Sequence, residues 1–157
     1  MALKIDNAAL SDLLGALYGA AASSQSTNKH FLTQLKNLLN LQHASLIVRP
    51  PTTTDAGLIY TSGDDADIAT SGTEEGSYTS LYIRDPLINL PLKEVVTLDE
   101  HTPRAQLLNS DYYRMFLEPF GIYYIAGIDW QYEKNSRISV RFTREKSQGE
   151  FTEDEKA

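Results

Sequence analysis

Two neighbouring segments near the C-terminal end of the chain alternate apolar and polar residues, and this alternation restricts the fold more than any other pattern. Five residues of the first segment share one strand face: Ile122, Tyr124, Ala126, Ile128 and Trp130. The same spacing brings Ile138, Val140 and Phe142 together in the second segment. The polar residues 133–136 between the segments are typical of a hairpin turn. The pattern therefore predicts a long antiparallel hairpin.

The N-terminal part predicts two helices followed by a shorter hairpin. Apolar residues recur at helical spacing over residues 8–22 and 29–41, and the polar run 23–28 between them is expected to be a loop. Short apolar runs at 44–49 and 57–62 predict the two strands of the hairpin.

The segment between the two hairpins predicts a helical crossover. Three helical pieces and a short strand are expected, at residues 74–83, 103–108, 110–118 and 94–98. The Asp85-Pro86 step should end the first piece, whereas Thr102 and Ser110 are suited to cap the other two. The order predicts an α+β fold in which N-terminal helices pack on one face of an antiparallel sheet and the crossover covers the other. Such a layout commonly leaves a ligand cavity beneath the crossover.

Composition limits the classes of protein to which the chain can belong. Its 157 residues, 41% of them hydrophobic, fit one domain with a sizeable core. The net charge of −7 disfavours contact between this chain and nucleic-acid phosphates. No apolar run approaches the roughly 20 residues that span a bilayer, and the N-terminus does not have the pattern of a secretory signal. The absence of cysteine agrees with a cytoplasmic location.

No pattern in the sequence points to catalysis, a metal or a cofactor. His30, His43 and His101 lie far apart, and we expect solvated surface side chains at all three. The chain has no Gly-x-Ser-x-Gly nucleophile motif, P-loop or Gly-x-Gly-x-x-Gly motif. We therefore expect neither an enzyme nor a cofactor.

Aromatic residues gather between residues 112 and 132 and around Asp85, which favours a pocket for a small organic molecule. Asp85 is the most specific candidate, because beside Tyr78 and Tyr82 its carboxylate can accept a hydrogen bond from a ligand N–H or O–H. The alternative is that it caps a turn before Pro86. Tyr78 and Tyr82 are four residues apart and share a helix face, where pocket lining and core packing are both open.

Further candidates lie downstream. Three aromatic residues are assigned to the same pocket, with core packing as the favoured alternative for each: Tyr112, Phe116 and Trp130. Arg137, Arg141 and Arg144 lie on or beside the last strand, and the first two share a face. Such a face can bind an anion, a nucleic acid or an acidic partner, but a solvated strand edge is the favoured interpretation.

The last residues form a helix start. Thr152 and Glu155 have the spacing of a capping box, with acidic residues in the first turn. We therefore expect the chain to continue into a helix in the complete protein. A short polar tail is the alternative.

Five stretches, taken together, resemble the N-terminal sensory region of LuxR-type helix-turn-helix transcription regulators of bacteria. They are residues 10–22 (LSDLLGALYGAAA), 82–87 (YIRDPL), 90–100 (LPLKEVVTLDE), 110–121 (SDYYRMFLEPFG) and 149–155 (GEFTEDE). The resemblance implies a GAF- or PAS-like sensor over residues 1–150. Residues 151–157 would then begin a linker helix leading to a C-terminal helix-turn-helix domain outside this chain.

The segment from Tyr82 to Pro86 is also similar to the aromatic-Asp-Pro segment of acyl-homoserine-lactone receptors in the wider family. In those receptors the Asp accepts a hydrogen bond from the ligand amide and aromatic residues surround the lactone. The similarity carries these roles to Asp85 and to Tyr78 and Tyr82. The chain lacks a tryptophan just upstream of the tyrosine, its one tryptophan being Trp130, so no lactone ligand is assigned.

The resulting expectation is a sensory domain that binds a small organic signal molecule, forms a homodimer and has no membrane contact. It would control DNA binding only through the C-terminal domain. The alternative is a ligand-independent dimerisation or protein-interaction module of the same fold, in which the aromatic cluster is core.

Overall fold

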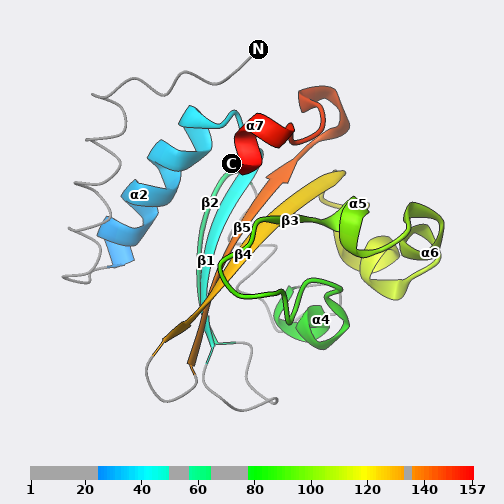
Figure 1. The fold of residues 1–157 in the computed structure, drawn as a ribbon, viewed down its shortest axis with the longest axis horizontal. Coiled ribbons are helices and arrows are strands. Elements are labelled where there is room, and N and C mark those ends of the chain that lie inside the picture. The colour runs from blue at the N-terminus through cyan, green and yellow to red at the C-terminus, as the bar shows by residue number, and fades with distance from the viewer. Residues whose placement is uncertain (1–24, 50–56, 65–77, 133–135) are drawn as a thin grey trace.

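The computed structural model describes residues 25–49, 57–64, 78–132 and 136–157 and has an α+β fold around a five-stranded antiparallel sheet (Figure 1). The strand bounds are His43–Arg49 for β1, Leu58–Ser62 for β2, Val96–Thr97 for β3, Tyr124–Tyr132 for β4 and Ser136–Arg144 for β5. Their spatial order is β2-β1-β5-β4-β3. The sheet stands between one long helix and the short helices of the crossover (Figure 1). This is the layered layout predicted from the sequence.

β4 and β5 form the predicted hairpin, paired from Tyr124 with Arg144 to Tyr132 with Ser136. β5 also pairs with β1 along its length, so it is a central strand. This finding corrects the expectation of a solvated edge, because Arg141 and Arg144 are buried. Periodicity identifies a strand but carries no signal of which distant segments will flank it, since that choice depends on packing.

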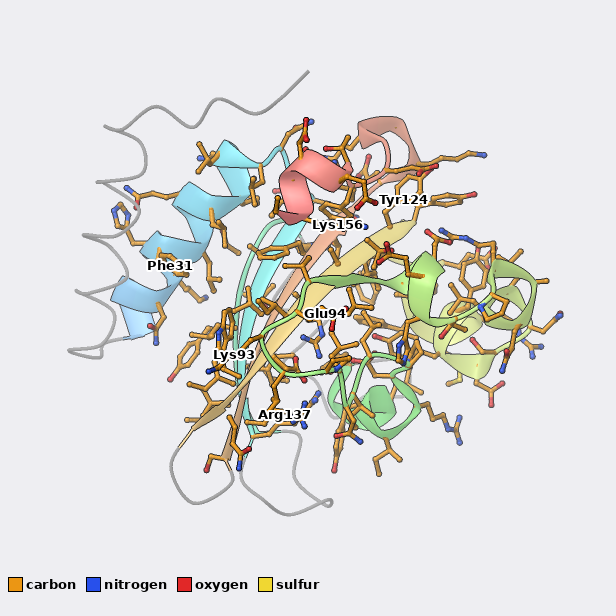
Figure 2. The ribbon with its side chains drawn as sticks, viewed as in Figure 1. Phe31, Lys93, Glu94, Tyr124, Arg137 and Lys156 are labelled. Carbon is orange, nitrogen blue, oxygen red and sulfur yellow. The ribbon has the colours of Figure 1, made fainter. Side chains whose placement is uncertain are left out.

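The long helix α2, Gln25–Leu38, packs on one face of the sheet. Phe31 (Figure 2), Leu32 and Leu35 form a buried cluster with Ala44 of β1 and with apolar side chains of β5. Burial of this helix face supplies the apolar core on one side of the sheet.

The bounds of α2 differ from those predicted. The helix begins earlier than residue 29, so the polar residues 25–28, expected to be loop, are helical. Intrinsic propensity is a weak signal that packing of the following turns overrides. The predicted helix over residues 8–22 lies outside the described residues. Within the described ranges, no helix has the length and apolar character required to cross a membrane.

The crossover consists of short helical elements. These are α4 (Tyr78–Leu81), the 3-10 turn η1 (Tyr82–Arg84), α5 (Leu98–His101), α6 (Arg104–Leu108) and the π-helical turn η2 (Tyr113–Leu117). As predicted, the first helical piece stops at Asp85, whose backbone is extended before a proline. Ser110 Oγ accepts the N–H of Tyr113 at 3.1 Å and so caps the last piece. Thr102 does not cap α6, because Pro103 occupies that position.

The C-terminal residues fold back onto the sheet. The 3-10 turn η4, Lys146–Gln148, precedes α7, Glu153–Lys156, and both halves of the predicted capping box are present in α7. Glu155 Oε1 lies 2.8 Å from Nη2 of the buried Arg144 of β5. Lys156 pairs with Glu100 of α5. α7 is therefore linked both to the central strand and to the crossover.

The Arg144–Glu155 pair predicts that docking of α7 is acid-sensitive. The hydrogen bond from Arg144 is the main cause that lowers the pKa of Glu155 from its ordinary 4.5. The stabilisation is therefore complete above pH 4.5 and is lost as pH falls through the lower folded-state pKa. Glu155→Gln should lower the free energy of unfolding by about 1–2 kcal/mol at neutral pH and by less in acid. Urea unfolding at several pH values measures both differences.

Glu118→Gln, at an exposed position, is the matched control and should leave the pH profile of unfolding unchanged. If acid destabilised the Glu155→Gln variant as steeply as the parent protein, the ion pair would not be the source of the dependence.

Candidate ligand-binding site

The two faces of β5 differ in chemical character. Ile138, Val140 and Phe142 share the α2 side with apolar partners. Polar residues of β5, β1 and β2 alternate with them and lie on the crossover side: Arg137, Ser139, Arg141, Thr143, His43, Ser45, Arg49 and Thr61. Most of this polar face is buried, although antiparallel sheets usually turn such a face to water. A covered polar face is suited to a binding site, because its groups need hydrogen-bond partners.

A cavity of about 50 Å³ lies between this polar face and the crossover. Three of the predicted pocket residues form its aromatic wall: Tyr78, Tyr112 and Phe116. The Phe116 ring centroid lies 5.7 Å from that of Tyr78 and 5.4 Å from that of Tyr112. The same rings belong to the buried core on this side of the sheet. For these three residues the two interpretations, pocket lining and core packing, therefore coincide.

Asp85 lines the cavity and is only 4% exposed. Its Oδ1 accepts the Leu87 N–H at 2.8 Å, which is the turn-capping role, and its Oδ2 accepts the Tyr78 hydroxyl at 2.7 Å. Arg49 donates in turn to the Tyr78 oxygen. Burial, followed by the nearby Asp85 charge, raises the pKa of Tyr78 well above its ordinary value, so Tyr78 remains a donor at neutral pH. A hydrogen bond from Asp85 to a ligand stays a prediction.

Other expected positions need correction. Tyr82 is buried, with its ring centroid 5.6 Å from the Arg49 guanidinium carbon, but it is not among the described residues that line the cavity. Trp130 is 36% exposed and lies on the α2 side of the sheet, because it alternates with Asp129. His43, expected to be solvated, is buried with its ring 3.0 Å from Thr143 Oγ1.

Asp129 is a buried residue that no sequence pattern had indicated as part of the site. It has no exposed surface, and its two carboxylate oxygens pair with Arg141 Nη1 at 2.6 Å and Arg137 Nη1 at 2.7 Å. The alternation of apolar and polar residues does place Asp129, Arg137 and Arg141 on the strand face opposite the apolar one. It indicates a buried cluster only once this polar face is known to be covered by the crossover.

The two arginines also hold the crossover to the sheet. Arg141 Nη2 donates to the Leu87 carbonyl at 2.6 Å, and Arg137 Nη1 donates to the Leu90 carbonyl at 2.9 Å. The Lys93 N–H donates to the Asp129 carbonyl at 2.8 Å. Figure 2 shows Lys93 and Glu94 beside the sheet. We call residues 87–93 the strap. Leu87 of the strap lines the cavity, and the Arg137–Asp129–Arg141 cluster joins the strap to the sheet.

Binding, rather than metal coordination, is the chemistry that the described side chains offer. Across the described ranges, no three His, Cys, Asp or Glu side chains converge in a way that could hold a metal ion. The surface of the cavity is mainly apolar, formed by aliphatic side chains and rings, and its lining residues also include hydroxyl groups, an imidazole, a carboxylate and a guanidinium. Such a mixture orients a small organic molecule through a few hydrogen bonds.

The fold is similar to that of two solved structures. The VqsR LBD domain from Pseudomonas aeruginosa matches with a TM-score of 0.65 and 13% identity, over 94% of this chain and 85% of that chain. Escherichia coli SdiA matches with a TM-score of 0.57 and 13% identity, over 86% of this chain and 55% of that chain. At such identity the likeness shows the fold alone. No protein-family model matches the chain, and no curated protein matches its sequence.

Two threonines on the polar face should respond oppositely to substitution. Thr61 Oγ1 is buried without a hydrogen-bond partner in the described part of the chain, whereas Thr143 Oγ1 accepts the His43 backbone N–H at 3.1 Å. Thr61→Val should raise the free energy of unfolding by about 1 kcal/mol, because it removes an unpaired buried hydroxyl. Thr143→Val should lower it by about 1–2 kcal/mol. Chemical denaturation of the two variants measures these changes. If Thr61→Val lowered the free energy of unfolding as much as Thr143→Val does, the Thr61 hydroxyl would contribute a stabilising hydrogen bond to the fold.

Proposed function

We propose that this chain is the small-molecule-sensing domain of a bacterial LuxR-type transcription regulator. The observation that carries the proposal is the buried polar sheet face with a cavity between it and the crossover. The fold likeness to the VqsR and SdiA domains supports it. Residues 1–150 would form the sensor, and residues 151–157 would begin the linker to a DNA-binding domain. The domain is proposed to act as a homodimer, without catalysis and without a cofactor.

The cavity volume indicates how sensing would work. A volume of about 50 Å³ is well below the roughly 300–1,000 Å³ of pockets that hold drug-sized ligands. A ligand larger than a few heavy atoms must therefore displace the strap or the Tyr112–Leu117 segment. Such a ligand shifts the equilibrium between closed and open forms only by the difference in its affinity for them. In this proposal the described structure is the closed form.

The same contacts offer a route from the cavity to the C-terminal turn. Arg141 and Arg144 lie on the same strand, one holding the strap and the other holding Glu155. Lys156 connects α7 to Glu100 in the crossover. A displacement of the crossover on ligand binding would therefore change the docking of α7. This change is the proposed signal to the DNA-binding domain.

The alternative is a ligand-independent interaction module, and two observations favour it. The Asp85 carboxylate already accepts two hydrogen bonds from the protein itself, and the aromatic wall is continuous with the core. In such a module the domain would dimerise or bind a protein partner through its outer surface. The two proposals differ in whether any small molecule stabilises the fold.

A thermal-shift screen of small metabolites against the whole chain tests the proposal. A sensor should be stabilised by a chemically related subset, following RT ln(1 + [L]/Kd), or about 2.7 kcal/mol at a hundredfold excess over Kd. Asp85→Asn should weaken binding of any hit that needs the cavity, because an amide replaces a charged acceptor. Asp111→Asn, on the exposed surface, is the control and should leave binding unchanged.

A screen without stabilising compounds, together with slow hydrogen exchange throughout the crossover, would contradict sensing and support the interaction module. Hits that bind Asp85→Asn and the parent protein equally would place the ligand elsewhere.

A further inference from the structure

The Tyr78 hydroxyl lies between two buried side chains of opposite charge. It donates to Asp85 Oδ2 at 2.7 Å and accepts a hydrogen bond from Nη2 of Arg49. Both charged residues are buried. Because buried charges are costly unless they are paired or hydrogen-bonded, the bridging hydroxyl stabilises the carboxylate and the guanidinium at the same time.

The same hydroxyl keeps the Asp85 carboxylate occupied beside the cavity. Asp85 Oδ2 accepts from Tyr78 and Oδ1 from the Leu87 N–H, so both oxygens are engaged within the chain. A molecule in the cavity of about 50 Å³ therefore meets mainly rings and aliphatic side chains. A ligand with an N–H or O–H group has to compete with the Tyr78 hydroxyl for Asp85 Oδ2.

The two neighbours of the hydroxyl define the chemistry of a group that could replace it. Such a group must donate to a carboxylate and accept from a guanidinium. A hydroxyl does both, whereas an amide N–H only donates and a carboxylate would be repelled by Asp85. Burial, followed by the Asp85 charge, raises the pKa of Tyr78 well above its ordinary value. These surroundings therefore favour a neutral hydroxyl.

The surroundings of the Tyr78 ring are suited to an aromatic ring. The Phe116 ring centroid lies 5.7 Å away, and the Arg49 guanidinium carbon lies 5.9 Å from the Tyr78 centroid. Ring pairs and cation–π contacts both stabilise an aromatic group in such a position. Phe116 also contacts the rings of Tyr112 and Phe120, with centroids at 5.4 Å and 5.6 Å. An exchange of the ring beside Phe116 would therefore affect the packing of η2.

We infer that Tyr78 is an internal competitor for Asp85, and that the ligand which displaces it is a neutral aromatic molecule with a hydroxyl group. Asp85 and Arg49 would hold the ligand hydroxyl as they hold that of Tyr78. Tyr78 belongs to α4, a single turn of four residues, so little regular structure is disrupted when its side chain leaves. The inference rests on the proposed sensory function, and it specifies the ligand class and the residue that controls access to the site.

Phenol is the probe, because it reproduces the ring and hydroxyl of tyrosine as a free molecule. Tyr78→Ala vacates the ring position, so phenol should bind there and raise the melting temperature of the whole chain in a saturable manner. Toluene has nearly the same shape without the hydroxyl. It should bind about tenfold more weakly, although it is the more apolar compound.

The parent protein and Tyr78→Phe are the controls for the position of binding. Neither compound should stabilise them at the same concentrations, because a ring attached to the chain outcompetes a free ring of equal size. Stabilisation of all three proteins by the same amount would place phenol elsewhere and overturn the inference.

Double variants identify the acceptor. Asp85→Asn in the Tyr78→Ala background should remove most of the preference for phenol, because an amide replaces the charged acceptor. Asp111→Asn, on the exposed surface, should retain the preference in the same background. If Tyr78→Ala does not fold by itself, recovery of its folded circular-dichroism spectrum in phenol but not in toluene is the readout. Equal effects of the two compounds, or no effect of either, would contradict the inference.

The outcomes separate this inference from the proposed function. Any compound that stabilises the parent protein in the thermal screen and depends on Asp85 should bind Tyr78→Phe about tenfold more tightly, because no internal hydroxyl competes with it. If such a compound bound both proteins equally, sensing would stand and the role of Tyr78 would fail. If phenol replaced Tyr78 in Tyr78→Ala but no compound stabilised the parent protein, the acceptor site at Asp85 would stand and the sensory proposal would fail.

Discussion

One buried carboxylate connects the crossover of this domain to its sheet. Asp129, with no exposed surface, holds Arg137 and Arg141, and these arginines hold the carbonyl groups of the strap. Loss of the carboxylate would leave two guanidiniums without their counter-charge, one of them deeply buried, which is far more costly than loss of a surface pair. The crossover therefore rests on the sheet through charge and hydrogen bonds as well as through apolar packing.

The two sides of the sheet are held to their neighbouring layers by different kinds of interaction. The α2 side is an apolar cluster around Leu32, Ala44 and Val140. Its burial stabilises the fold through the hydrophobic effect, which does not depend on the direction of individual contacts. The crossover side carries paired charges and hydroxyls, whose energies depend on geometry and on what lies against them. Buried polar groups that lack a partner are costly, so a ligand that pairs with them can stabilise the fold. The sensory proposal follows from this asymmetry.

The sequence predicts the positions of the strands and helices better than it predicts which of their polar faces are buried. Alternation at Ile138, Val140 and Phe142 correctly identified β5 and one of its faces, and the Asp85-Pro86 step correctly marked the end of a helix. Periodicity does not tell whether a polar face meets water or another layer, so Arg141 and His43 were assigned to solvent and Asp129 was overlooked. Trp130 lies near other aromatic residues in the sequence, but strand geometry turns it to the side of the sheet opposite the cavity.

The position of β5 at the centre of the sheet limits which insertions and deletions the sequence can accept. Successive side chains of a strand point to opposite faces, so insertion or deletion of a single residue within Ser136–Arg144 would exchange the faces of all positions beyond it. Guanidiniums would then enter the apolar layer under α2, while isoleucine and valine would replace the polar groups on the crossover side. Related chains are therefore expected to differ in the length of their loops, while the length of β5 stays constant.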